Sequence, residues 1–278
     1  DRVSTGPLWL DGGSMFGVAP KPLWEKAYGP TDETNRIELV ANIMLIRFGA
    51  KAVLVDCGCG SKMSEKLTRI YGIDREKSEP RNALAPFGIA PEDITDVVLT
   101  HLHFDHAGGA TTYVDGQLAP SFTSATYYIQ KQQLDWAMNP TDKDRASYFP
   151  ENFMPVVESG RLCILDGETE LFEGVRIHVF DGHTAGLQTV SVTDGRETIF
   201  YAGDLMPTSA HIPLPFNTAF DNNPVLSIEE KRQLLTRAVD ENWTIAFEHD
   251  AYTAACKVIR SERGFAKGEM VNQLQIFN

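Results

Sequence analysis

The chain has 278 residues, and its 25 Lys and Arg residues against 38 Asp and Glu residues give a formal net charge of −13. Hydrophobic residues make up 42% and charged residues 23%, values typical of a globular protein and not of a disordered, collagen-like or coiled-coil chain. No stretch approaches the ~20 apolar residues of a membrane span, so no membrane insertion is expected. The acidic balance argues against a nucleic-acid partner, because phosphate backbones are bound mainly by Lys and Arg.

The length allows one or two domains, and we expect a single domain over 1–278 with two similar halves, about 1–165 and 166–278. Four cysteines in a chain of this size do not make a disulfide framework, so free and mostly buried thiols are expected. The first residues carry neither an initiator Met nor a signal sequence, which leaves the compartment open: a soluble cytoplasmic protein or a mature exported form. Monomer and homodimer also both stay open.

The predicted elements of the first half alternate between strands and a helix. Strands over Asn42–Phe48 and Ala52–Asp56 flank a short turn and predict a hairpin. A helix over Ser61–Tyr71 is expected to end at Gly72. The short apolar run Asp96–Thr100 is typical of a strand that is buried on both faces.

The second half repeats this style. Strands are predicted over Val175–Phe180, Gln188–Val192 and Thr198–Ala202, the last two joined by an Asp-Gly turn. Ser227–Glu230 has the pattern of a capping box that opens a helix, and Thr244–Phe247 is predicted as another buried strand. Strands and helices mixed in two similar halves predict a layered α/β domain with two packed sheets.

Three of the seven histidines lie in one short segment, directly after the strand predicted at 96–100. His101, His103, Asp105 and His106 are four ligand-type side chains within six residues, a density typical of a site for zinc, iron or manganese. Alternation projects the side chains at 101, 103 and 105 in one direction while His106 turns aside. This geometry favours two adjacent metal ions over one.

Three further ligand-type residues each follow a predicted strand: His183, Asp204 and His249. Sites in α/β folds collect at the carboxyl ends of strands, so these loops are expected to converge with the 101–106 segment. His178 lies in the middle of a predicted strand and is expected to be an ordinary buried polar residue.

The segment Thr-His-Leu-His-Phe-Asp-His at 100–106, with the later Gly-His, Gly-Asp and His, resembles the metallo-β-lactamase superfamily over nearly the whole chain, from 42 to 249. The resemblance implies the α/β fold of that superfamily, an αβ/βα four-layer sandwich. It implies two bound divalent transition metal ions. Zinc is the expected metal, and iron, manganese and cobalt are the alternatives. The implied ligands are His101, His103 and His183 for one ion, Asp105, His106 and His249 for the other, and Asp204 as the bridge.

Two further stretches, 11–24 and 203–211, resemble the YtnP-like quorum-quenching lactonases of this superfamily. The resemblance implies a hydrolase that opens the ring of N-acyl-homoserine lactones, with an acyl lactone as its small-molecule partner. A metal-bridged hydroxide would attack the carbonyl carbon, and Asp105 would move the proton to the leaving oxygen. His211 would act on the substrate as a hydrogen-bond donor or proton source, or else play a supporting role.

Other readings stay open at this point. The same hydroxide would suit other lactones, aryl esters or phosphotriesters, which makes a related metallohydrolase the main alternative. An iron thiol dioxygenase and a non-catalytic metal-binding module are two further alternatives. If the substrate has an acyl tail, segments 15–24 and 213–220 are expected to line its groove.

Overall fold

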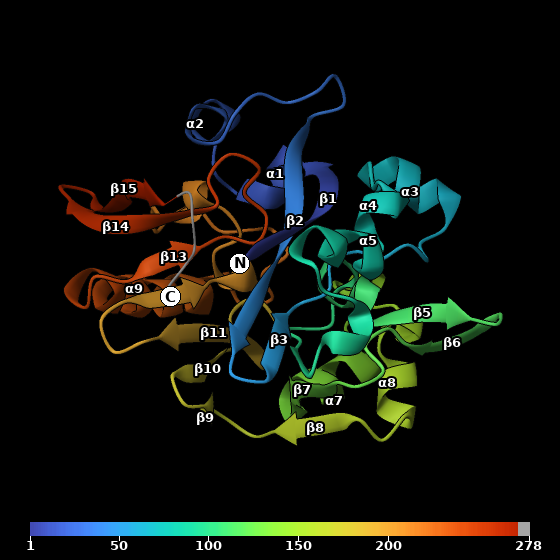
Figure 1. The fold of residues 1–278 in the computed structure, drawn as a ribbon. Helices are drawn as coiled ribbons and strands as arrows, with labels where there is room; N and C mark the ends of the chain where they lie inside the picture. The colour runs from blue at the N-terminus through green and yellow to red at the C-terminus, as the bar shows by residue number, and fades with distance from the viewer. Residues whose placement is uncertain (272–278) are drawn as a thin grey trace. The chain divides into compact units, whose positions relative to one another are not determined.

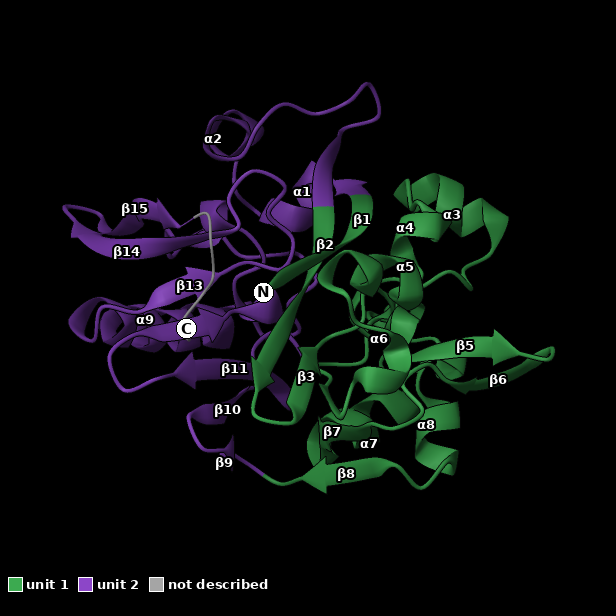
Figure 2. Ribbon diagram, in the orientation of Figure 1, with its two compact units in different colours: residues 1–8, 40–166 green, residues 9–39, 167–278 purple. Residues whose placement is uncertain are grey.

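The computed structural model describes residues 1–271, whose helices and strands are labelled in Figure 1. The chain forms two compact units, coloured separately in Figure 2. Unit 1 comprises Asp1–Leu8 and Val40–Asp166, and unit 2 comprises Trp9–Leu39 and Gly167–Asn278. The sequence-based halves did not anticipate that 9–39 belongs to the second unit, and the single-domain organisation stays a prediction.

Unit 1 contains a six-stranded sheet with the order β1-β2-β3-β4-β7-β8 and a separate β5-β6 pair. Strands β2 and β3 form the predicted hairpin, with Phe48 paired to Lys51. Strands β3, β4, β7 and β8 run parallel to one another, so their carboxyl ends lie at one edge of the sheet. The strands are β1 (Arg2–Asp11), β2 (Arg36–Phe48), β3 (Lys51–Val55), β4 (Asp96–Val98), β5 (Thr111–Val114), β6 (Gln117–Pro120), β7 (Thr126–Gln130) and β8 (Leu162–Leu165). The end of β1 and the start of β2, 9–11 and 36–39, belong to unit 2.

The helices of unit 1 are short. The predicted helix after position 61 begins later, because the Ser64 side chain accepts a hydrogen bond from the backbone N–H of Leu67, and it ends as predicted at Gly72 in the left-handed conformation. The helices are α3 (Glu65–Tyr71), α4 (Arg75–Ser78), α5 (Pro80–Leu84), α6 (Phe104–Ala107), α7 (Lys131–Met138) and α8 (Met154–Glu158).

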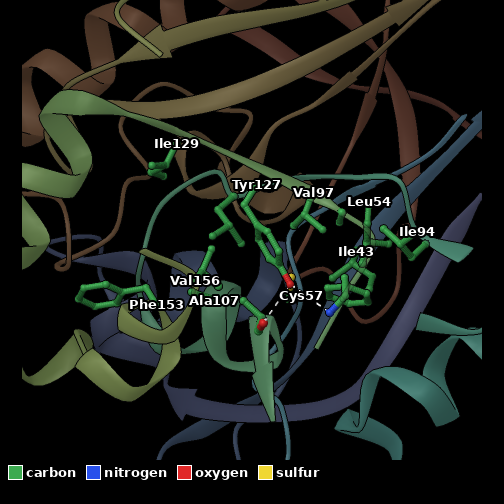
Figure 3. Close-up of a cluster of buried hydrophobic side chains, with 14 of the residues drawn as sticks. Ile43, Leu54, Cys57, Ile94, Val97, Ala107, Tyr127, Ile129, Phe153 and Val156 are labelled. Atoms are coloured by element: carbon green, nitrogen blue, oxygen red, sulfur yellow. Dashed lines mark hydrogen bonds between the residues drawn. The ribbon is translucent and has the colours of Figure 1, made fainter. Parts of the chain in front are cut away.

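The core of unit 1 is built on the parallel strands. Figure 3 shows Leu54, Val97 and Tyr127, from β3, β4 and β7, among its buried side chains. The Tyr127 hydroxyl donates a hydrogen bond to the carbonyl of Ala110 and accepts one from the backbone N–H of Phe122, so this polar group is satisfied inside an apolar cluster. The core therefore holds the segment that follows the histidine-rich loop.

Unit 2 contains a seven-stranded sheet with the order β15-β14-β13-β12-β11-β10-β9. The predicted Asp-Gly hairpin is confirmed, with Thr193 paired to Thr198, and β12 and β13 form a parallel pair. The strands are β9 (Thr169–Phe172), β10 (Val175–Phe180), β11 (Leu187–Thr193), β12 (Thr198–Tyr201), β13 (Thr244–Ala246), β14 (Ala255–Ser261) and β15 (Gly264–Val271). Helices α1 (Gly12–Phe16), α2 (Lys21–Ala27) and α9 (Pro224–Asp240) belong to the same unit.

Helix α9 corrects one prediction. It begins before Ser227, and its first turn is capped by the Asn223 side chain, which accepts a hydrogen bond from Leu226 N. Ser227 therefore lies inside the helix, where its hydroxyl donates back to the carbonyl of Asn223. The Pro at position 224 is the first helical residue, so the helix starts four residues earlier than the capping-box pattern indicated.

Within the described residues, 1–271, no helix is long and apolar enough to cross a membrane.

Candidate metal centre

In unit 1 the predicted ligand loop follows β4 and is tied to the end of β3. Val98 pairs with Val55 in the parallel register, which brings Asp56 beside the start of the loop. The Asp56 carboxylate accepts two hydrogen bonds of 2.7 Å from Thr100, one from the backbone N–H and one from the hydroxyl. The Nδ1 atom of His106 lies 3.1 Å from the same carboxylate. Asp56 thus fixes the tautomer of His106 and leaves Nε2 as its metal-binding atom.

His101 and His103 converge through their ring nitrogens. His101 Nδ1 lies 3.0 Å from the Thr100 hydroxyl, and His101 Nε2 lies 2.9 Å from His103 Nδ1. Two ligands of one tetrahedral zinc ion, each at about 2.05 Å, are about 3.3 Å apart. The two nitrogens lie about 0.4 Å closer than this, so a small outward rotation of the rings would let them bind a common cation. The Asp105 carboxylate is likewise near His106, with 3.8 Å between Oδ1 and Nε2.

Two glycines allow the ligand loop to lie directly on the backbone of 57–60. A Cβ atom on Gly108 would come within 2.0 Å of the carbonyl oxygen of Cys59, and one on Gly109 within 2.2 Å of that of Cys57. The backbone N–H of Cys57 also donates to the carbonyl of His106. The ammonium group of Lys62 donates to the carbonyls of Gly108 and Thr111, which fixes the end of the loop.

In unit 2 the parallel register of β12 and β13 explains how two ligand-type residues meet. Tyr201 pairs with Ala246, and Asp204 and His249 each follow three residues later. Equal offsets from a parallel pair place both side chains at one edge of the sheet. His183 lies in the turn between β10 and β11, which ends at the same edge because β11 runs antiparallel to both β10 and β12.

The Asp204 carboxylate lies between two imidazoles. Its Oδ2 atom is 3.3 Å from His183 Nε2, and its Oδ1 atom is 3.2 Å from His249 Nε2. Both distances match the separation of about 3.3 Å expected for two ligands of one tetrahedral ion. Each carboxylate oxygen is thus paired with a different histidine, which is the arrangement that a bridging carboxylate needs.

Asp221 is a functional candidate that the sequence reasoning missed. Its Oδ1 atom lies 2.9 Å from His183 Nδ1 and accepts a hydrogen bond of 2.8 Å from the Thr218 hydroxyl. Burial alone would raise the pKa of Asp221, but the hydrogen bonds from His183 and Thr218 hold it below its ordinary value. The ionised carboxylate therefore accepts a hydrogen bond from the Nδ1–H of His183 and directs Nε2 toward Asp204.

Glu248 is a second residue that was missed. Its side chain is fully buried, and its ligand atom lies within 4.8 Å of those of Asp204 and His249. The available signal was its place directly before His249 and after a buried strand, where a carboxylate is unusual. Two carboxylates this close in a buried setting favour a bound cation.

His211 is fully buried and uses both ring nitrogens inside unit 2. Nδ1 lies 2.8 Å from the Thr208 hydroxyl, and Nε2 lies 2.7 Å from the carbonyl of Met15. Burial lowers the pKa of His211 to about 4, so the ring is neutral near pH 7 and Nε2 donates to the carbonyl. This geometry argues against the predicted action on substrate and favours the supporting role.

His178 has the structural environment that was expected of it. Its Nε2 atom lies 2.8 Å from the Ser191 hydroxyl, and burial lowers its pKa to about 4. Three apolar side chains of the segment 15–24, which was expected to line an acyl groove, are instead buried in the core: Met15, Phe16 and Trp24. Phe16 is fully buried, and its ring stacks on those of Trp24 and His211 at centroid distances of 5.2 and 4.6 Å.

The donor sets of the two units fit divalent transition metals. Imidazole nitrogens and carboxylate oxygens are the ligands these ions prefer, and outer carboxylates orient a histidine in each unit. His and Asp residues able to bind divalent metal ions are therefore present, and the donors alone do not select the metal.

Comparison with known proteins agrees with this chemistry. N-acyl homoserine lactonase from Bacillus thuringiensis is 27% identical over 172 residues, or 61% of this chain and 61% of its own length, so the chain spans about three fifths of the curated lactonases it matches. Ribonuclease TTHA0252 from Thermus thermophilus is 29% identical over 60% of this chain, which is 36% of that protein.

Solved structures give fuller coverage. A probable metal-dependent hydrolase from Staphylococcus aureus has a TM-score of 0.88 and 29% identity over 99% of this chain and 97% of its own. AidC, a dizinc quorum-quenching lactonase solved with a product, has a TM-score of 0.81 over 98% of this chain and 94% of its own, and at 18% identity it shows the fold alone. The Metallo-beta-lactamase superfamily model matches residues 36–249. The predicted fold and the predicted class, a metal-dependent hydrolase, agree with these matches: the chain belongs to the metallo-beta-lactamase superfamily.

Proposed function

We propose that this protein opens the lactone ring of N-acyl-homoserine lactones with the help of two divalent metal ions. The observation that carries the proposal is the Asp204 carboxylate, whose two oxygens face the Nε2 atoms of His183 and His249 at 3.3 and 3.2 Å. A carboxylate shared between two ligand sets supports a dinuclear centre. The seven proposed ligands are His101, His103, Asp105, His106, His183, Asp204 and His249.

Two bound divalent ions would supply Lewis acidity and a lowered pKa for water at neutral pH. The chain's own residues prepare that chemistry. Asp56 and Asp221 accept hydrogen bonds from the Nδ1–H groups of His106 and His183, so that both rings keep Nε2 unprotonated for metal binding. Asp204 would be a ligand shared by the two ions.

Hydrolysis adds water to the lactone carbonyl carbon and breaks the bond from that carbon to the ring oxygen. A carboxylate oxygen of Asp105 is proposed to take the proton from the attacking water and to return it to the ring oxygen as that bond breaks. The relative accessibility of Asp105 is 7%, whereas His211 is fully buried. Asp105 is therefore better placed than His211 to contact substrate. The loop 213–220 is proposed to contact the acyl chain.

The lactone substrate rests on the similarity to N-acyl homoserine lactonases, which are low-identity relatives. The similarity to a ribonuclease would suggest RNA as the substrate. The net charge of −13 argues against this, because it would repel a polyanionic substrate. Related hydrolysis of other lactones, aryl esters or phosphotriesters is the competing proposal.

The test is a substrate panel on zinc-reconstituted protein, comprising homoserine lactones with C4 to C12 acyl chains, a small lactone, an aryl ester and paraoxon. We expect kcat/KM to be highest for the homoserine lactones and to rise with acyl length by up to about fourfold per methylene until the site is full. A flat chain-length profile, or a preference for paraoxon, would favour the competing proposal.

A further inference from the structure

Helix α9 carries two neighbouring residues that each hold a different functional loop of unit 2. The Glu230 carboxylate accepts hydrogen bonds of 2.7 and 3.0 Å from the backbone N–H groups of Asp181 and Gly182. These residues directly precede His183. The loop lies so close to the helix at Gly182 that a Cβ atom there would be 2.4 Å from the backbone nitrogen of Ser227. This close approach explains why the residue is a glycine.

Lys231 holds the loop that follows Asp204 in the chain. Its side chain is 1% exposed, and its ammonium group donates to the carbonyls of His211, Pro213 and Phe216 at 2.9, 3.3 and 2.6 Å. A buried ammonium is costly unless its three hydrogens find acceptors, and here three carbonyls of one loop supply them. Few residues other than lysine could satisfy three carbonyls from one point.

We propose that Glu230 and Lys231 are positioning residues with separate tasks. Glu230 fixes the metal-binding loop of His183. Lys231 fixes loop 211–216, which overlaps the loop 213–220 that the proposed function assigns to the acyl chain. The second task rests on that proposed function. Because the two side chains are neighbours on one helix, a change that merely loosens α9 would disturb both loops together. Separate tasks predict separate effects.

The experiment compares Glu230→Gln with Lys231→Met, and uses the exposed neighbours Glu229→Gln and Arg232→Met as matched controls. The Glu229 carboxylate accepts hydrogen bonds from Arg232 and Gln233 on its own helix, so its loss should leave both loops in place. Three quantities are measured on each protein: zinc affinity by competition with a chelating dye, hydrogen exchange of the amides at 211–217, and kcat and KM for N-hexanoyl homoserine lactone.

Glu230→Gln should weaken zinc binding by about 10–100-fold, the range for losing an outer partner of a metal ligand, and leave exchange at 211–217 unchanged. Lys231→Met should speed that exchange by about tenfold or more and raise KM more than it lowers kcat, with zinc affinity unchanged. Both controls should behave like the wild type.

The proposal would be overturned if Glu230→Gln and Lys231→Met each changed both the zinc affinity and the hydrogen exchange at 211–217. It would also be overturned if both variants behaved like the wild type. If Lys231→Met does not fold, Lys231→Gln keeps two donors and should show the same pattern to a smaller extent. Zinc affinity and hydrogen exchange need no substrate, so a protein that hydrolyses no lactone would contradict the proposed function while the two positioning tasks could still be confirmed or overturned.

Discussion

The two units supply metal ligands in opposite ways. Unit 1 offers four ligand-type residues from one loop, 101–106, held by the single carboxylate of Asp56 at the end of the neighbouring strand. Unit 2 offers three of the predicted ligands, each after a different strand, and Asp221 and Glu230 of helix α9 hold the loop of one of them, His183. A compact motif can therefore be recognised locally, whereas a dispersed set depends on strand register and on partners far away in the chain.

The largest expected effect comes from changing Asp204, which lies between the other two predicted ligands of unit 2. Asp204→Asn removes one charge from the carboxylate between His183 and His249 and should lower kcat by at least about a hundredfold, more than an outer partner would. Steady-state kinetics with zinc present would measure this, with the exposed hairpin residue Asp194→Asn as control. Retention of two zinc ions with nearly normal kcat would show that Asp204 is no bridge.

The outer carboxylates test whether both units orient their histidines by the same device. Asp56→Asn and Asp221→Asn should each weaken zinc binding by about 10–100-fold, because an amide holds the Nδ1 hydrogen of His106 or His183 less firmly than a carboxylate does. Competition titration measures the affinity, and Asp142→Asn on the surface is the control. Normal affinity in Asp221→Asn alone would mean that only unit 1 relies on this orientation.

Close backbone approach is a further feature that the units share. Gly108→Ala would place a methyl group 2.0 Å from the carbonyl oxygen of Cys59, and Gly182→Ala would place one 2.4 Å from the nitrogen of Ser227. Because both obstacles are backbone atoms, each variant should lose about 1–3 kcal/mol of stability. Chemical denaturation measures this loss, and an unchanged midpoint in either variant would contradict the packing described for that loop.

The smallest expected effect separates a structural histidine from the ligands. Burial lowers the pKa of His178 from 6.5 to about 4, so the folded state binds this proton less tightly than the unfolded chain does. The stability associated with the neutral ring is complete above pH 6.5 and is lost as the pH falls toward 4. His178→Gln should therefore show a smaller decline of Tm between these pH values, with unchanged zinc content. Loss of zinc from this variant would be inconsistent with a purely structural His178.

The ligand-type residues of the segment 101–106 could be predicted from the sequence, because four metal-binding side chains fall within six residues directly after a buried strand. The strand-end residues His183, Asp204 and His249 were also found, since polar residues after apolar runs have a recognisable pattern. Their grouping by roles came from the resemblance to a family, and these individual roles stay proposals.

The supporting residues were not readable in this way. Asp221 lies 38 positions from His183, and Glu230 lies 48 positions from Gly182, so only the fold brings each pair together. Glu230 was instead assigned to a capping box, because a local pattern was available and the tertiary partner was not. The placement of 9–39 in unit 2 was missed for the same reason, since it depends on contacts such as that of His211 with Met15.

The proposed dinuclear centre requires that the compact and the dispersed ligand sets bind two metal ions together. The most direct test is a zinc titration of chelator-treated wild-type protein, with metal content and hydrolysis of N-hexanoyl homoserine lactone followed in the same samples. Activity is expected to rise to a plateau at two zinc ions per chain. Full activity at one zinc ion per chain, with no further binding, would contradict the proposed dinuclear centre.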